Sequence, residues 1–336
     1  MQIRIKNKSI GTDSPVYIIA EAGLNHNGCL KYAKKMIEIA FNANIDAIKF
    51  QTFKAEDLSH PSSPYYKIFK KAELTYNDFK EISDYSKSLG ITFFSTPFSL
   101  ESVDMCQKLN VPAFKIASGD LTFLPLIKKI ASIKKPIIIS TGMANMKEIN
   151  EAIDVIKKEK NEKIIILHSV SSYPTPNTEL NINAIHLLQE KFNYPVGFSH
   201  NGPGLLVPCI AVGAGAKVIE KHFTLNKKLK GPDHNFSLSP QELQDLVKQI
   251  REIEIMLGNS EKKCQPSEKI IRQLARRSIT ANSDLKRGTI LTRYNISSKR
   301  PANGLAPKYF EKVLGKRLLR HIKAFEPIKR SDLTFH

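Results

Sequence analysis

The chain has little cysteine and lacks the short motifs that mark several common protein classes. Its four cysteines in 336 residues are widely spaced and form no CxxC pair, so neither a disulfide framework nor a zinc knuckle is indicated. It has no GxxxxGK(S/T) or GxGxxG loop, which argues against a nucleotide ligand. No apolar run reaches the roughly 18 residues that cross a bilayer, and MQIRIKNKSIG at the N-terminus has no apolar signal core. We therefore expect a cytoplasmic protein without a membrane partner.

Acidic residues are outnumbered by basic ones. The sequence has 51 Lys and Arg against 32 Asp and Glu, a net charge of +19 and a pI near 9.6. Such an excess can mark nucleic-acid binding. Here the lysines are spread over every expected helix, and no arginine-rich tract, RRM signature or zinc finger is present. We expect a solvated lysine surface or a protein that serves small anionic substrates, and no nucleic-acid partner.

Short apolar runs alternate with amphipathic helical stretches through the first 257 residues. Alternation of this kind predicts right-handed crossovers and a parallel sheet. Eight units fit a closed (β/α)8 barrel, the TIM barrel, better than an open sheet. The expected strands are Val16–Ala20, Ala47–Phe50, Thr92–Ser95, Ala113–Ile116, Pro136–Ser140, Lys163–His168, Pro195–Ser199 and Lys217–Lys221.

Helices are expected between and after these strands, and a second domain follows them. The clearest helical patterns are Leu30–Asn44, Tyr76–Ser88, Met146–Lys158, Leu180–Lys191 and Pro240–Leu257. We predict a barrel domain over residues 1–258, a polar linker over 259–276, and a small domain of short strand-like pieces over 277–336.

Every expected strand ends in polar residues. In a barrel these positions converge on the C-terminal mouth, where active sites lie. The strand-end residues are Glu21, Lys49, Gln51, Thr96, Lys115, Ser118, Ser140, Thr141, Ser169, Ser199, His200 and His222.

Cations and hydroxyls dominate this set. Lys49, Lys115, Lys221 and Arg300 are candidate cations for one cavity, where they suit a phosphate and a carboxylate. Taken singly, each lysine is more often a charge at the rim. The hydroxyls of Thr96, Ser118, Ser140 and Ser199 add donors, so the pattern predicts a small, doubly anionic substrate.

A metal ligand and acidic groups complete the expected mouth. His222 is a candidate ligand for a divalent cation, and Ser199-His200-Asn201 on the neighbouring strand offers a second donor. The carboxylates are Glu21, Asp120 and Asp233, which can act as a base or orient a sugar hydroxyl. Asp233 follows Gly231-Pro232 and reads equally well as a turn residue.

Ordered blocks along the whole chain resemble the sialic-acid synthase family, which includes N-acetylneuraminate, legionaminate and pseudaminate synthases. The tail resembles that family's C-terminal antifreeze-like (SAF) domain. The blocks are IIAEAGLNHNG (18–28), KFQTF (49–53), FFSTPF (93–98), FKIASGD (114–120), STGMA (140–144), YPTP (173–176), VIEKHFTL (218–225), GPDHNFSL (231–238) and KRPANGL (299–305).

The resemblance implies a TIM barrel plus an SAF domain in a domain-swapped homodimer that uses Mn²⁺ or Mg²⁺. It implies that phosphoenolpyruvate condenses with an open-chain N-acetylated amino sugar, with Asp120, Glu21 and Lys115 as catalytic residues. By the same resemblance, phosphoenolpyruvate contacts Lys49, Thr96, Lys115, Ser118, Ser140 and Ser199. The sugar contacts Glu21, Gln51, Tyr173 and Asp233, and Arg300 reaches the site from the partner subunit.

Two positions depart from the family pattern. Asp120 stands where the family has a glutamate, which leaves the charge on a side chain one methylene shorter. The family's Ser-x-His motif is replaced by Ser199-His200-Asn201. Either Asn201 joins His222 at the metal through its amide oxygen, or His200 turns in, or the metal site is weakened. The product expected is N-acetylneuraminate or legionaminate. Pseudaminate synthesis, a related barrel enzyme for phosphorylated aldoses, and a weakly active ligand-binding paralogue remain alternatives.

Overall fold

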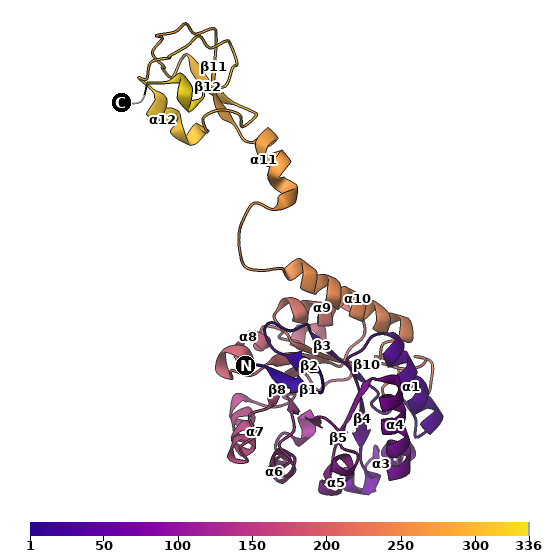
Figure 1. Cartoon of the computed structure of the whole chain (residues 1–336). Helices are drawn as coiled ribbons and strands as arrows, with labels where there is room; N and C mark the ends of the chain where they lie inside the picture. The colour runs from indigo at the N-terminus through magenta and orange to yellow at the C-terminus, as the bar shows by residue number, and fades with distance from the viewer. Residues whose placement is uncertain (335–336) are drawn as a thin grey trace. The chain divides into compact units, whose positions relative to one another are not determined.

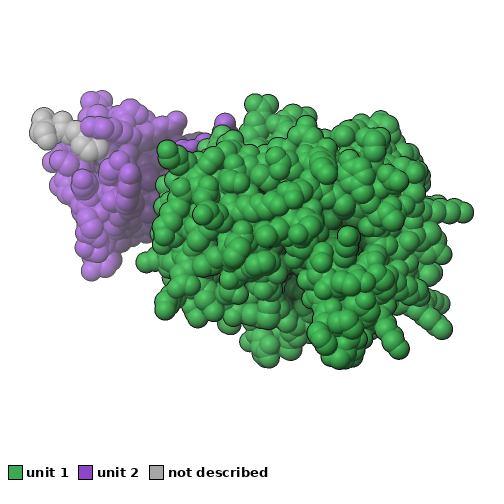
Figure 2. Space-filling model, turned by 90° about the horizontal axis from the view of Figure 1, so that it is seen from below, with its two compact units in different colours: residues 1–258 green, residues 259–336 purple. Residues whose placement is uncertain are grey.

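The computed structural model describes residues 1–334, which divide into two compact units, Met1–Gly258 and a second that begins at Asn259 (Figure 2). Each unit has its own hydrophobic core. The large core includes the barrel strands and the inner faces of the helices, and the small one is built around Ile279, Leu318 and Ile322. Among the described residues, no helix is long and apolar enough to cross a membrane.

The first unit is a closed barrel of eight parallel strands with helices around it (Figure 1), as the sequence predicted. The strand order is β10-β3-β4-β5-β6-β7-β8-β9, so strands that follow one another in the chain are neighbours in the wall. The strands are β3 (Tyr17–Glu21), β4 (Ala47–Thr52), β5 (Thr92–Pro97), β6 (Phe114–Ile116), β7 (Ile137–Ser140), β8 (Ile164–Ser169), β9 (Val196–His200) and β10 (Val218–His222).

Local sequence explains where the helices begin. The Asn145 side chain accepts hydrogen bonds from two backbone N–H groups at the start of α7. The Glu148 carboxylate accepts one from the backbone N–H of Asn145, which completes a capping box. Ser239 and Glu242 do the same for α10, which also has a proline in its first turn. The helices are α1 (Leu30–Asn42), α2 (Ala55–Leu58), α3 (Tyr66–Ala72), α4 (Tyr76–Leu89), α5 (Leu100–Lys108), α6 (Leu124–Ser132), α7 (Met146–Lys158), α8 (Ala184–Lys191), α9 (Leu206–Gly213) and α10 (Pro240–Leu257).

All eight expected strands match the structure to within two residues at each end. Some short elements were not predicted from the sequence: an N-terminal hairpin, β1 (Ile3–Ile5) with β2 (Lys8–Ile10), and the helices α2 and α3 in the long connection after β4. These pieces are three to seven residues long. Segments that short have little periodicity of their own to reveal them.

The second unit contains a two-stranded antiparallel sheet, β11 (Ser278–Ala281) with β12 (Ile296–Lys299), and the short helix α12 (Phe310–Val313). Isolated bridges such as Leu285–Ile322 and Leu318–Leu333 connect the remaining segments. Residues expected to form a linker include the helix α11 (Lys269–Ala275).

Candidate active site

The barrel register places charged strand ends side by side. His222 pairs with Glu21, and Glu21 pairs with Lys49 on the next strand. Further round, Gln51 pairs with Thr96, and Ser169 pairs with Ser199. These positions lie toward the carboxyl ends of the strands, so one mouth gathers groups as far apart in sequence as Glu21 and His222.

A polar pocket occupies this mouth, and most of the predicted site residues line it. Six of the predicted residues do not belong to its lining, namely Asp120, Thr141, His200, Lys221, Asp233 and Arg300. The lining residues are Glu21, Lys49, Gln51, Thr96, Phe98, Lys115, Ala117, Ser118, Ser140, Ser169, Tyr173, Ser199, Asn201, Glu220 and His222.

Two buried lysines line the pocket. Lys49 Nζ lies 2.5 Å from Glu21 Oε2 and donates to Thr96 Oγ1 at 2.9 Å. Lys115 Nζ donates to Ser140 Oγ at 2.6 Å. Both ammonium groups are almost fully shielded from solvent, at 4% side-chain exposure each. They are therefore strong electrostatic partners for an anion that enters the barrel.

Glu220 links the two lysines and was missed in the sequence analysis. Its carboxylate lies 3.6 Å from the Nζ of both Lys49 and Lys115 and accepts a hydrogen bond from Ser199 Oγ at 2.9 Å. Strand alternation was the signal that could have found it, because Glu220 and His222 are two residues apart and face the same side.

The same strand alternation shows that the prediction of Lys221 as a cation of this cavity was wrong. Lys221 does not point into the pocket but lies fully buried on the opposite face of β10, where its ammonium group donates to the carbonyl of Gly202. Burial lowers the Lys221 pKa to about 7, and the nearby Lys227 contributes to this shift. Lys221 is therefore not a cation of this cavity.

Burial and neighbouring charges set the protonation of the pocket. Burial lowers the pKa of Lys115 to about 8, although Glu220 partly offsets it. At Lys49 burial acts in the same direction, but Glu21 and Glu220 outweigh it and raise the pKa. Burial works against the Glu220 carboxylate, yet the two lysines lower its pKa. These ion pairs therefore favour the protonated, ammonium form of Lys49 and Lys115 beside the carboxylates.

Small hydroxyl groups form another wall. Ser118 Oγ and Ser169 Oγ lie 3.2 Å apart, and both accept from the backbone N–H of Gly142, at 3.1 and 3.0 Å. A Cβ at Gly142 would come within 2.3 Å of Ser171 Oγ. Glycine in STGMA thus allows the backbone to approach these serines closely.

Asp120 lies just outside this wall, at the end of the 3-10 turn Ser118–Asp120. Its Oδ2 is buried without a hydrogen-bond partner. Burial raises its pKa to about 6, against the opposing effect of Lys115. A carboxyl group with such a pKa can both accept and release a proton near neutral pH.

His222 and Asp233 meet at the other side of the mouth. His222 Nδ1 is buried, has no hydrogen-bond partner, and lies 3.9 Å from Asp233 Oδ2. The backbone N–H of Leu24 donates to the same carboxylate oxygen at 3.2 Å. The ring of Tyr173, itself more than half exposed, meets His222 edge-on with centroids 6.4 Å apart.

The loop that carries Asp233 is hydrogen-bonded to the loop after β3. Asn25 Nδ2 donates to Phe223 O at 2.7 Å and to Ser237 Oγ at 2.9 Å. His234 bonds Thr224 Oγ1 at 2.7 Å and Asn27 at 3.3 Å. These contacts explain why the polar residues of LNHNG and GPDHNFSL occur together, and they hold Asp233 beside His222.

The two alternative metal donors on β9 lie in different environments. Asn201 lines the pocket and donates through Nδ2 to Val170 O at 2.9 Å. His200 lies outside the lining and stacks on Phe198, with ring centroids 5.9 Å apart. Burial lowers the His200 pKa to about 3, with a smaller effect of Lys221. Within residues 1–334, no group of three or more His, Cys, Asp or Glu side chains is placed to hold a metal ion.

Arg300 belongs to the second unit. It follows β12 directly, is exposed, and precedes Pro301 through a cis peptide bond. It lies outside the first unit, which contains the barrel pocket.

A closed parallel barrel with a charged, hydroxyl-rich pocket at the carboxyl ends of its strands defines a TIM-barrel enzyme. The chain belongs to the NeuB family, whose model matches residues 36–262, and the SAF domain model matches residues 276–334. The resemblance drawn from the sequence blocks is thereby confirmed.

Individual relatives cover nearly the whole chain. An uncharacterized protein of Methanocaldococcus jannaschii is 47% identical over 317 residues, with 94% of each chain covered. The N,N'-diacetyllegionaminic acid synthase of Campylobacter jejuni is 43% identical over 328 residues, covering 93% of this chain and 98% of the relative. A pseudaminic acid synthase of that species is 35% identical over 339 residues, covering 96% and 98%.

A solved structure shows the same arrangement of elements. The N-acetylneuraminic acid synthetase of Leptospira borgpetersenii, in complex with citrate, has a TM-score of 0.78 and 37% identity. The match covers 81% of this chain and 95% of that chain.

Proposed function

We propose that this chain is a nonulosonic acid synthase that condenses phosphoenolpyruvate with an open-chain N-acetylated hexosamine and releases phosphate. The single observation that carries the proposal is the pair of buried ammonium groups, Lys49 and Lys115, at the mouth of the barrel beside Thr96 and Ser140. Two buried cations with hydroxyl donors suit a small molecule that bears both a phosphate and a carboxylate.

The acceptor we favour is a 2,4-diacetamido-2,4,6-trideoxyhexose, which would give a legionaminate. The support is the 43% identity to a legionaminic acid synthase over almost the full chain. N-acetylmannosamine, which would give N-acetylneuraminate, is the second acceptor within this proposal. Pseudaminate synthesis stays as an alternative, since pseudaminic acid synthases are also relatives over the full length.

In the proposed reaction, C3 of phosphoenolpyruvate attacks the sugar aldehyde, water adds at C2, and phosphate leaves with cleavage of its C–O bond. Lys49 and Lys115 bind the phosphate and the carboxylate of phosphoenolpyruvate. These two anionic groups also accept hydrogen bonds from the hydroxyls of Thr96, Ser118, Ser140 and Ser199. Asp120 transfers protons, for which its raised pKa suits it. Glu21, Gln51, Tyr173 and Asp233 position the sugar.

A divalent cation, Mn²⁺ or Mg²⁺, fits the side of the mouth where His222 Nδ1 lacks a hydrogen-bond partner. His222 and the pocket-lining Asn201 would hold it, and His200 is the less suited alternative because its ring lies outside the lining. With few protein ligands, the remaining positions would be filled by substrate and water. When bound, such a cation would polarise the aldehyde oxygen.

The experiment that tests the function offers phosphoenolpyruvate with a panel of N-acetylated hexoses and follows phosphate release and product mass. The proposal expects phosphate release with the 2,4-diacetamido sugar that gives a legionaminate, or with N-acetylmannosamine, and a nine-carbon acid as product. Turnover only with the pseudaminate precursor would favour that alternative. Absence of turnover with every sugar at saturating metal would favour a paralogue that only binds ligands.

The electrostatics of Lys115 predict a pH dependence. A lysine is cationic below its pKa, so we expect kcat/KM for phosphoenolpyruvate to fall as pH rises through about 8. Glu220 raises the Lys115 pKa, and Glu220→Gln should therefore move this alkaline limb to lower pH. Glu252→Gln, at an exposed position on α10, is the matched control and should leave the profile in place. Superimposable profiles for wild type and Glu220→Gln would contradict the assignment.

A homodimer with exchanged small domains is part of the proposal. Helices α10 and α11 expose large apolar side chains that a partner subunit would cover, namely Ile255, Met256, Leu257, Ile270, Ile271 and Leu274. Arg300 would then act on the partner's barrel, where its guanidinium suits the acyl oxygen or hydroxyls of the sugar.

Hybrid dimers test this arrangement. Wild type is exchanged with an inactive Lys115→Ala, Arg300→Ala double variant, and the hybrid is isolated through two different tags. If Arg300 acts in trans, each site of the hybrid has one defect and the hybrid is nearly inactive. If it acts in cis, one site stays whole, so half of the wild-type activity would rule out the exchanged arrangement.

A further inference from the structure

Most of the net positive charge of the chain lies in its second unit. From Asn259 onward the sequence has nineteen Lys and Arg against six Asp and Glu, which is +13 of the net +19 in less than a quarter of the residues. The residues that line the barrel pocket all belong to the first unit.

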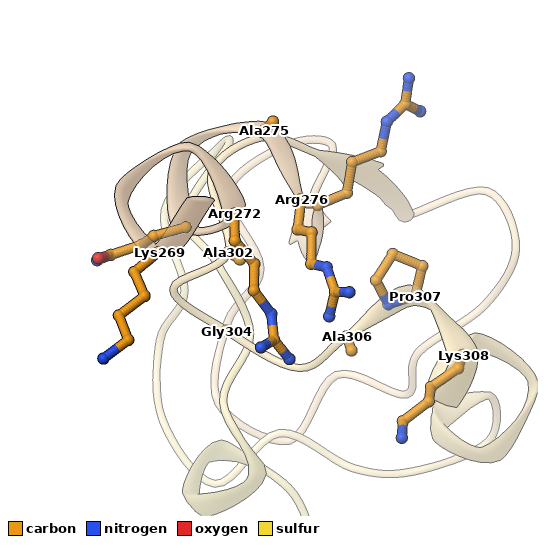
Figure 3. A pocket seen from close by; sticks show the side chains of 11 residues that line it. Lys269, Arg272, Ala275, Arg276, Ala302, Gly304, Ala306, Pro307 and Lys308 are labelled. Atoms are coloured by element: carbon orange, nitrogen blue, oxygen red, sulfur yellow. The ribbon is translucent and has the colours of Figure 1, made fainter. Parts of the chain in front are cut away.

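An open pocket of about 650 Å³ is formed within this unit by α11 and the segment 302–308. Its lining contains five cationic side chains and no carboxylate. Figure 3 shows the guanidinium groups of Arg272 and Arg276 extending into the same space, with Lys308 on the opposite side. The lining cations are Lys269, Arg272, Arg276, Arg277 and Lys308.

Three of these cations have no protein partner within residues 1–334. Lys269, Arg272 and Arg276 make no side-chain hydrogen bond or ion pair there, whereas other arginines of the unit are paired. Arg293 lies 2.6 Å from Glu311, and Arg320 lies 2.6 Å from Asp332. Clustered like charges repel one another, and a bound anion would relieve that repulsion.

The walls of the pocket are fixed to each other by hydrogen bonds. The backbone N–H of Ala302 donates to Gln273 O at 2.8 Å, which ties the floor to α11. Ser278 Oγ accepts from the backbone N–H groups of Asn303 and Gly304, at 2.9 and 2.8 Å. The floor also carries only small side chains at Ala302, Gly304 and Ala306, so a ligand can approach the backbone.

We propose that this pocket binds a small molecule that carries at least two phosphate or carboxylate groups. Guanidinium groups match both kinds of anion with two parallel hydrogen bonds, and several cations in one pocket select a ligand with more than one negative group. The volume falls in the range of small-molecule sites. The site is made by the second unit alone and is independent of the reaction proposed for the barrel.

Calorimetric titration of the full chain with inorganic pyrophosphate tests the proposal at physiological ionic strength. All variants carry Lys115→Ala, which weakens anion binding in the barrel and keeps any remaining contribution of Lys49 the same in every variant. The double change Arg272→Gln, Arg276→Gln should weaken pyrophosphate binding by roughly tenfold or more. The matched control Lys286→Gln, Arg287→Gln removes the same charge at exposed positions outside the pocket and should leave the affinity unchanged.

Two further arms locate the ligand and define its chemistry. In hydrogen-exchange mass spectrometry, pyrophosphate should protect peptides that cover residues 269–277 and 302–308. A parallel titration with citrate separates carboxylate from phosphate recognition, and binding of either anion that depends on Arg272 and Arg276 supports the site. Equal affinity in the pocket variant, or an equal loss in the control variant, would overturn the proposal by showing general attraction to a basic chain.

Discussion

Lys115→Ala is expected to reduce kcat/KM for phosphoenolpyruvate by at least tenfold. Lys115 is buried, bonded to Ser140 and next to Glu220, so its ammonium group is a fixed cation in a shielded site. A hydrogen bond between a charged group and a bound anion contributes about 1.5–3 kcal/mol, and each 1.4 kcal/mol is a factor of ten. The KM for the sugar should change much less than that for phosphoenolpyruvate.

Steady-state kinetics with phosphoenolpyruvate varied at saturating sugar measure this effect. Lys115→Met keeps the buried aliphatic stem and separates loss of charge from loss of packing. Lys147→Ala, whose side chain is 85% exposed, is the control and should behave as wild type. An unchanged dependence on phosphoenolpyruvate concentration in both Lys115 variants would show that this lysine does not bind the anion.

His222→Ala is expected to abolish metal-dependent activity, a loss of roughly a hundredfold or more if the cation supplies several kcal/mol to the transition state. The basis is a buried imidazole in the pocket whose Nδ1 has no hydrogen-bond partner. Direct binding of Mn²⁺, measured by calorimetry without substrate, gives a second readout and should weaken in the same variant. Full activity of the wild type in excess chelator would show that the reaction needs no metal ion.

The second metal ligand is identified by comparing two neighbouring changes. Asn201→Ala should raise the metal concentration needed for half-maximal activity, because Asn201 lines the pocket. His200→Ala should leave it unchanged, since that ring stacks on Phe198 outside the lining. The opposite order would show that His200 turns toward the site when metal binds, and no effect from either change would exclude both residues.

The barrel could be predicted from the sequence because its strands are continuous apolar runs. Ile137–Ile139 and Ile164–Ile166 are fully buried on both sides, as strands of a parallel barrel must be, so each run marks a strand with little ambiguity. Polar residues directly after such runs then identify the mouth of the barrel. This reasoning predicts that Glu21, Lys49, Lys115 and His222 share one pocket, and all four line it in the structure.

Details that depend on side-chain direction were harder to predict. Lys221 and Glu220 are adjacent, and only the pleat decides that Glu220 enters the pocket while Lys221 is buried behind it. The choice between Asn201 and His200 has the same origin at the end of β9. The position of Asp233 depends on hydrogen bonds between residues far apart in sequence, such as that from Asn25 to Ser237, which a sequence pattern does not reveal.

The central claim is that phosphoenolpyruvate and an N-acetylated hexosamine condense in this barrel with cleavage of the C–O bond of phosphoenolpyruvate. The most direct measurement uses phosphoenolpyruvate with ¹⁸O in the bridging position and follows both products by mass spectrometry. We predict that the released phosphate carries the label and that the other product is an unlabelled nine-carbon acid. Label retained in the sugar acid, or release of phosphate without any condensation product, would contradict the account.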